Sequence, residues 1–146
     1  MNFPTFNPDI AKALPEYTKR SPYCALLGIE IEDVGPGTIR VSLPVGDSLH
    51  SGVGAVHGGA IVSLVDHALS LAVYPLVEIG KWVATLEYKI NYLAPVKMGA
   101  EPSKIVADAR VLSLKKTLAV VRVDVTHGET LVATAQGTDF IRDKLA

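Results

Sequence analysis

The chain has 146 residues, 49% of them hydrophobic, with a mean hydropathy of +0.30 and a net charge of −1. This length fits one domain, and the near-neutral charge without a long run of lysine or arginine argues against a nucleic-acid partner. The apolar content is more than a small monomer easily covers, so we expect a homo-oligomer. Asp66 and His67 interrupt the longest apolar run, which argues against a membrane span. A single cysteine, Cys24, and a polar start without signal-peptide features predict a cytoplasmic protein.

The first part of the chain holds a short helical pattern followed by a hairpin pattern. Residues 7–19 have helical spacing that Pro15 disturbs, so we treat residues 1–20 as an accessory segment and residues 21–146 as the main domain. Apolar and polar residues then alternate on both sides of a Gly-Pro-Gly turn, which predicts a β-hairpin over residues 29–43.

The last part of the chain is rich in β-forming residues. Four such runs are separated by short turn segments, and they cover residues 82–95, 103–114, 117–127 and 129–142. They predict an antiparallel meander. A hairpin, one long helix and a meander together indicate an α+β fold in which the sheet wraps over the helix.

The central helix is expected to follow the segment "GAVHGG", which ends at Gly59. Apolar residues at three- and four-residue spacing form one broad face that packs on the sheet: Ile61, Leu64, Val65, Ala68, Leu69 and Ala72. A narrow polar stripe shares the same spacing: Ser63, Asp66, His67, Ser70 and Tyr74. Asp66 is then either a functional acid or a structural acid on a solvated edge, whereas His67 and His127 are expected to be structural or solvated.

Two glycines at the helix start offer an anion site. Gly58 and Gly59 present backbone N–H groups at the positive end of the helix dipole, which can hold a developing oxyanion. A tight turn into the helix is the alternative interpretation. Gly58 and Asp66 are eight residues apart, or about 12 Å along a helix, so one bound carbonyl cannot contact both. If they serve one reaction, Asp66 comes from a second copy of the chain, related by a two-fold axis.

The helix motif "VHGGAIVSLVDHALSLA" resembles the signature of hot-dog-fold acyl-CoA thioesterases of the phenylacetyl-CoA, or PaaI-like, type. The segments "NYLAPVKMG", "KKTLAVVRVDV" and "LVATAQGTDFI" resemble further strands of that family, so the likeness covers roughly Ser21 to Arg142. The resemblance implies a long helix wrapped by a curved antiparallel sheet, dimers joined edge to edge, and tetramers of two dimers. It also implies an acyl-CoA substrate, no cofactor, and active sites at the dimer interface.

The resemblance assigns roles to four residues of the motif region. The Gly58 N–H would polarise the thioester carbonyl, and Asp66 of the partner subunit would act as general base or nucleophile. His57 would brace the turn. Thr85 would help to hold the attacking water, although an outward-facing strand threonine is an equal alternative.

The sequence departs from the family at Ser51, where relatives often have an asparagine. The second hydrogen-bonding arm of that amide is absent, and Ser51 or the adjacent His50 would replace part of its role. We expect Gly59, Tyr88 and Tyr92 to contribute to substrate binding, with the two tyrosines on a partner strand.

Coenzyme A carries several negative charges, which a chain of net charge −1 must meet with local basicity. The candidates are Arg110, Lys115, Lys116 and Arg122, which we expect to border a groove leading to the helix start. The alternative is that they protect a solvated sheet edge by charge.

Two other functions remain open at this stage. A hot-dog dehydratase or hydratase would need a histidine paired with an acid in an arrangement that the chain does not show. A non-catalytic acyl-CoA-binding or regulatory module is favoured by Ser51 but opposed by Asp66 and Gly58. No Cys/His spacing indicates a metal site, and no Ser-His-Asp order indicates a hydrolase triad.

Overall fold

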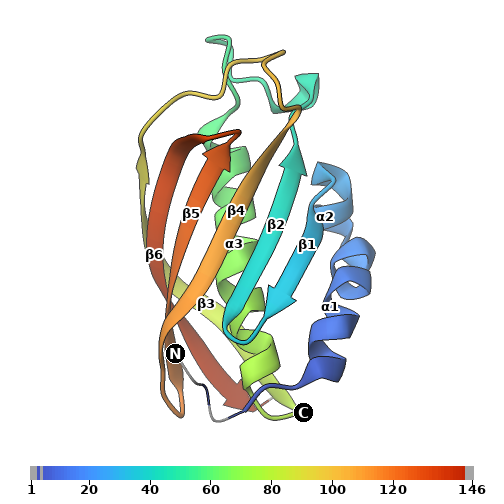
Figure 1. Cartoon of the computed structure of the whole chain (residues 1–146), viewed down its shortest axis with the longest axis vertical. Helices are drawn as coiled ribbons and strands as arrows, with labels where there is room; N and C mark the ends of the chain where they lie inside the picture. Colours follow the sequence, from blue (N-terminus) through green and yellow to red (C-terminus); the bar gives the residue numbers. More distant parts are fainter. Residues whose placement is uncertain (1–2, 4, 144–146) are drawn as a thin grey trace.

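The computed structural model describes residue 3 and residues 5–143, and it shows one long helix wrapped by a curved antiparallel sheet (Figure 1). The helices are α1 (Pro8–Arg20), α2 (Pro22–Leu27) and α3 (Gly58–Val73), with short 3₁₀ turns η1 (Asp47–Leu49) and η2 (Tyr74–Leu76). The strands are β1 (Glu30–Gly35), β2 (Thr38–Pro44), β3 (Lys81–Tyr92), β4 (Lys104–Leu114), β5 (Leu118–His127) and β6 (Thr130–Asp143). The α+β hot-dog architecture expected from the sequence is therefore confirmed.

The strand order corrects one expectation. The six strands lie in the order β1-β2-β4-β5-β6-β3, so only β4, β5 and β6 form a meander. The chain leaves α3 through η2 and enters β3 at the far edge of the sheet, beside β6, while β4 pairs with β2. The loop after β3 then crosses the end of the sheet, where the Leu93 N–H donates to the Val132 carbonyl at 2.8 Å.

Helix α3 forms the centre of the hydrophobic core. Leu64, Val65, Ala68 and Leu69 are fully buried against the sheet, as their spacing predicts. The segment Gly58–Leu76 is long and apolar enough to cross a membrane by length and composition, but 61% of its apolar window is buried inside this fold. Its hydropathy is therefore accounted for by its place against the inner face of the sheet (Figure 1).

The N-terminal helices belong to this core more closely than the sequence predicts. Helix α1 continues through Pro15, buries Leu14, and packs against β1. Helix α2 follows after Ser21 and was not expected from the sequence. It ends at Gly28, whose φ of 72° lies in the left-handed region that favours glycine.

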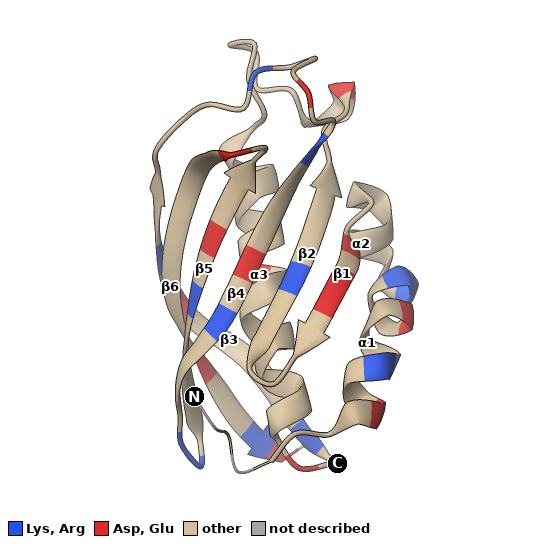
Figure 2. Ribbon diagram, viewed as in Figure 1, with Lys and Arg blue, Asp and Glu red and all other residues tan. Residues whose placement is uncertain are grey.

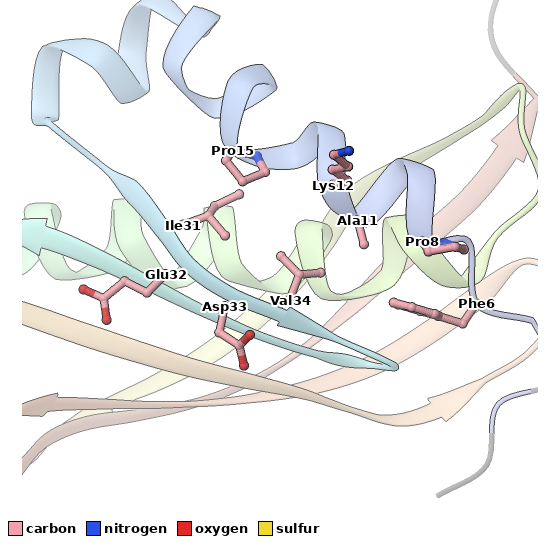
Figure 3. Close-up of a pocket in the computed structure, with 9 residues that line it drawn as sticks. All are labelled: Phe6, Pro8, Ala11, Lys12, Pro15, Ile31, Glu32, Asp33 and Val34. Atoms are coloured by element: carbon pink, nitrogen blue, oxygen red, sulfur yellow. The ribbon is translucent and has the colours of Figure 1, made fainter.

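A shallow groove of about 400 Å³ runs between α1 and β1. Figure 3 shows Ala11 and Pro15 of α1 across from Ile31 and Val34 of β1, whereas Glu32 and Asp33 point away from the helix. The short acidic edge strand β1 is thereby partly covered by a helix, which protects a sheet edge from pairing with another chain.

Strand β3 contains a β-bulge that decides which of its side chains face α3. The pairing with β6 shifts between Thr85 and Glu87, so Leu86 is the extra residue. Before the bulge the odd residues Val83 and Thr85 are covered, and after it Tyr88 is covered instead. A bulge adds one residue to one strand and so reverses the inward and outward alternation. Thr85 and Tyr88, three residues apart, therefore both lie on the helix side of the sheet.

Acidic and basic residues occur along β1, β2, β4 and β5, as the coloured segments of the ribbon in Figure 2 show. Arg40 on β2 makes two hydrogen bonds to Asp108 on β4, at 2.8 and 3.0 Å. Arg122 is bonded to Asp124 along β5 at 3.1 Å. These pairs, the first exposed and the second half-buried, keep the outer face polar, while the inner face is apolar except at a few positions.

Candidate active site along helix α3

The start of α3 holds an unused backbone donor. His57 caps the helix, because its Nδ1 accepts a hydrogen bond from the Gly59 N–H at 2.8 Å. Among the described residues no acceptor pairs with the Gly58 N–H, which is the first of the helix. The Tyr92 hydroxyl donates to the Gly58 carbonyl at 3.1 Å and ties the end of β3 to this turn. His57 therefore braces the turn, and Gly58 presents a donor at the positive end of the helix dipole.

Asp66 lies in the third turn of α3, exposed, at the mouth of a pocket of about 270 Å³. Seven further residues from α2, α3 and the strands line the pocket: Tyr23, Cys24, Ile29, Val62, Ser63, His67 and Tyr88. Burial raises the pKa of Tyr88, and the negative charge of Asp66 raises it further. The pocket thus joins one carboxylate to a chamber of mixed lining, in which hydroxyl groups and the His67 ring lie beside apolar side chains.

The two parts of the site do not meet within one chain. Gly58 begins α3 and Asp66 follows eight residues later on a continuous helix, which places them about 12 Å apart along the axis. Tyr88 and Tyr92 were expected to reach the site from a partner strand. The structure instead places Tyr88 beside Asp66, and Tyr92 against Gly58, in the same chain.

Thr85 faces the helix rather than solvent. Its hydroxyl lies 3.1 Å from the hydroxyl of Ser70, which is one helical turn beyond Asp66 on α3. The outward-facing alternative for Thr85 does not apply, because Thr85 shares the covered side of β3 with Val83. Asp66, Ser70 and Thr85 therefore follow one another from the surface inward.

Sequence reasoning missed Asp139, which is fully buried on the inner face of β6. Burial raises the pKa of Asp139 to about 6, the Thr85 hydroxyl lowers it in part, and the charge of Asp66 raises it. A signal was present in the sequence, because Asp139 continues the inward-facing series of alternating residues Ala133, Ala135 and Gly137.

His67 has a structural environment. Its Nε2 lies 3.0 Å from the Thr18 hydroxyl of α1, and its Nδ1 lies 3.6 Å from the Cys24 sulfur of α2. Burial lowers the pKa of His67, against the opposing effect of Asp66. His67 therefore links both N-terminal helices to α3, beside the pocket of Asp66.

Ser51 and His50 are engaged in their own loop. The Ser51 hydroxyl donates to the Ala55 carbonyl at 2.7 Å, and the His50 Nδ1 accepts from the Gly52 N–H at 3.1 Å. Neither side chain bonds to the α3 start in this chain, so their predicted role as a substitute for asparagine stays a prediction.

The four basic candidates lie apart from the helix start. Lys115 and Lys116 are exposed in the turn between β4 and β5, at the end of the sheet opposite to Gly58 (Figure 1). Arg110 and Arg122 are paired neighbours on the outer face of the sheet. One chain therefore does not bring these residues together with Gly58.

No group of three or more histidine, cysteine, aspartate or glutamate side chains suited to a metal ion occurs in the part of the chain that the structure describes. The chemistry available at α3 is that of a backbone donor, a carboxylate and hydroxyl groups.

Comparison with known proteins gives consistent matches over the site. A model of the thioesterase superfamily matches residues 53–134, from the loop before α3 into β6. The chain is 32% identical over 130 residues to acyl-coenzyme A thioesterase 13 of Homo sapiens, and the match covers 88% of each chain. A thioesterase of Haemophilus influenzae has a similar structure, with a TM-score of 0.82 and 28% identity, over 93% of this chain and 92% of that one. A mutant of the phenylacetic acid degradation protein PaaI from Thermus thermophilus gives a TM-score of 0.74 and 28% identity, over 82% and 98%.

Proposed function

Since the chain belongs to the thioesterase superfamily and is an acyl-CoA thioester hydrolase, we propose that it hydrolyses a short or aromatic acyl-CoA at a site shared by two copies of the chain. The membership confirms the PaaI-like resemblance of the sequence. The observation that carries this proposal is the separation of two functional groups along α3. A free N–H at Gly58 and a carboxylate at Asp66 lie too far apart to act on one carbonyl in one chain. Two antiparallel helices would bring the Gly58 end of each against Asp66 of the other.

The edge strand β3 supports this pairing. It has 12 residues and stands at the end of the sheet, where none of the described strands pairs with its outer edge. It exposes Trp82, Leu86 and Tyr92. A long edge strand with exposed apolar side chains is a ready template for a second strand. We therefore assign the β3 edge to a dimer contact, whereas the tetramer and the cytoplasmic location stay predictions.

The mechanism follows from the two ends of α3. The thioester carbonyl oxygen would accept the Gly58 N–H, which stabilises the negative charge that develops there during attack. Asp66 of the partner subunit would take a proton from a water molecule as that water attacks the carbonyl carbon. The carbon–sulfur bond then breaks, and the coenzyme A sulfur leaves with the proton, giving a free acid and coenzyme A.

Asp66 could instead attack the carbonyl itself and form a mixed anhydride. A single turnover in ¹⁸O-labelled water separates the two roles. If Asp66 attacks directly and water then hydrolyses the anhydride at the Asp66 carbonyl, ¹⁸O enters the Asp66 carboxylate, which water activated by a general base cannot produce because it places ¹⁸O in the product acid alone.

The pocket beside Asp66 supports a small acyl group. Its volume of about 270 Å³ is at the small end for ligand sites. Cys24 of α2 and Ile29, just before β1, close its inner side and are themselves buried. An aromatic or short acyl group fits such a chamber, and a long alkyl chain would have to leave it.

Asp66→Asn tests the chemical role of this acid. The amide is nearly isosteric but cannot accept the proton, so we expect kcat to fall about 100- to 10,000-fold. Because Asp66 is exposed and makes no salt bridge among the described residues, the melting temperature and substrate binding should be nearly unchanged. Near-normal kcat in this variant would refute the proposal.

Mixing two inactive variants tests the shared site. Asp66→Asn and a bulky replacement of Gly58 each damage both sites of a homodimer, but a mixed dimer contains one site with both groups intact. We expect partial recovery of activity after subunit exchange. Confirmed exchange without recovery would show that Gly58 and Asp66 act within one chain or not at all.

A further inference from the structure

Asp139 is a buried acid for which the proposed mechanism has no use. It is fully buried on β6, and neither carboxylate oxygen has a hydrogen-bond partner of good geometry among the described residues. Buried polar groups in proteins are nearly always satisfied, and a buried carboxylate without partners is strongly disfavoured. Its retention in the core beneath α3 therefore calls for a functional explanation.

The neighbours of Asp139 lead towards the active site. Thr85 is its pairing partner across the β3–β6 ladder, so the two side chains share one face of the sheet. The Thr85 hydroxyl lies 3.1 Å from that of Ser70. Ser70 follows Asp66 by four residues on α3, which places both on one side of the helix. Asp139, Thr85, Ser70 and Asp66 thus form a row of polar groups from the core to the pocket.

Among residues 5–143, the remaining surroundings of Asp139 contribute no compensating positive charge. Its pairing partner on β5 is Ala119, which is apolar and buried. Tyr74, at the end of α3, is neutral, and the charge of Asp139 contributes to raising its pKa. The charged group that acts on Asp139 is Asp66, of the same sign. Thr85 is the hydroxyl that favours the ionised form of Asp139, and it does so only in part.

We propose that Asp139 is a positioning residue for thioester hydrolysis, setting the direction of hydrogen bonding along Thr85 and Ser70 towards the water beside Asp66. An ionised Asp139 can only accept, so Thr85 donates to it and Ser70 donates to Thr85. The Ser70 oxygen then accepts a hydrogen bond from the water. This bond orients the water so that a lone pair on its oxygen points at the substrate carbonyl. A protonated Asp139 donates instead, and the chain can reverse so that Ser70 donates towards Asp66 and weakens it as a base.

This inference rests on the proposed function and adds a pH dependence to it. Burial places the pKa of Asp139 at about 6, so its contribution to kcat should decline by about tenfold between pH 7 and pH 5, as for a single ionisation. Asp139→Asn keeps the size of the side chain but does not titrate. We therefore expect this variant to lose the inflection near pH 6, with KM little changed.

Two further variants separate a hydrogen-bonded chain from a simple charge effect. Thr85→Val removes the connecting hydroxyl while Asp139 still titrates, so the inflection near pH 6 should also disappear. If the charge of Asp139 acted on Asp66 through space, Thr85→Val would keep it. Asp143→Asn changes an exposed acid on the same strand, paired with Lys81, and should keep the profile of the native enzyme.

The outcomes distinguish this inference from the proposed function. If Asp66→Asn is inactive but Asp139→Asn keeps the inflection near pH 6, the role of Asp139 is wrong and the general mechanism stands. If Asp66→Asn is active, the mechanism itself fails. Infrared titration of the carboxyl band in the native protein and in Thr85→Val gives a readout independent of activity and of the folding of Asp139→Asn. The absence of a carboxyl group titrating near pH 6 would overturn the inference.

Discussion

Gly137 is the point at which the fold and the site are most tightly coupled. It lies on β6 opposite Tyr88, just after the bulge in β3. A methyl group at this position would lie 2.7 Å from the Glu87 carbonyl oxygen, 2.7 Å from the Tyr88 Cβ and 3.1 Å from a methyl of Leu69. Ordinary carbon contacts lie at about 3.5–4.0 Å. Gly137→Ala therefore forces β3 away from β6, because the backbone of β3 is what it meets.

The loss of stability expected for Gly137→Ala can be compared with that of other substitutions that add a methyl group to a packed core. Extra methyl groups in packed cores destabilise by about 1–3 kcal/mol, and for a domain of this size about 3 °C of melting temperature corresponds to 1 kcal/mol. We therefore expect Gly137→Ala to melt about 3–9 °C lower than the native protein. The shift of β3 would also displace Thr85 and Tyr88, so kcat/KM should fall even at temperatures where the variant is folded.

Differential scanning calorimetry at fixed protein concentration and a thiol-release assay measure these two effects. Gly46→Ala is a matched control, because nothing lies within 4 Å of a methyl group there and its φ of −124° suits any residue. The control should melt and react like the native protein. A Gly137→Ala variant with native melting temperature and native kcat/KM would refute the coupling between this contact and the site.

Three further predictions concern the pocket, the nucleotide end and the buried acid. Val62→Phe should fill part of the pocket beside Asp66, so kcat/KM measured on a panel of acyl-CoAs should fall more for aromatic acyl groups than for acetyl. Replacing Lys115 and Lys116 together by alanine should raise KM at unchanged kcat, with a smaller effect at high salt, if these exposed lysines bind the phosphates; an unchanged KM would remove them from the site. Asp139 has a pKa raised from 3.8 to about 6 in the folded chain, so its stabilising effect, full at low pH, is lost as the pH rises through 6. Asp139→Asn should therefore have a free energy of unfolding up to about 3 kcal/mol higher than the native protein at pH 8, with the difference vanishing by pH 4; equal stability at all pH values would contradict this.

The sequence was sufficient for those parts of the fold whose periodicity is local. The alternation around the Gly-Pro-Gly turn predicts the β1–β2 hairpin, and the spacing of Leu64, Ala68 and their neighbours predicts the buried face of α3. The position of β3 beside β6 was not predictable in this way, because strand order depends on contacts between distant segments. Helix α2 was missed since its six residues are too few for a helical period to show.

The site was predictable to a similar degree. Gly58, His57 and Asp66 stand in a motif of adjacent residues, so their arrangement on one helix follows from helical geometry alone. That Thr85 and Tyr88 lie on the same side of β3 depends on a bulge at Leu86, for which the sequence carries no marker such as a glycine. Asp139 could have been found from the alternation of β6, but its closeness to Thr85 required the register between two strands.

The bulge in β3 also divides one strand into two parts that can vary separately. The part before Leu86 carries Thr85 and borders the row of groups that leads to Asp139. The part after Leu86 carries Tyr88 and Tyr92, which border the acyl pocket and the helix start. A change in the second part would alter the lining of the pocket and leave the Thr85 hydroxyl in place. Deleting Leu86 alone would remove the bulge but leave Thr85 opposite Asp139 and Glu87 opposite Thr138, so both tyrosines would keep their side of the sheet and β3 would lose only the extra local twist that a bulge provides.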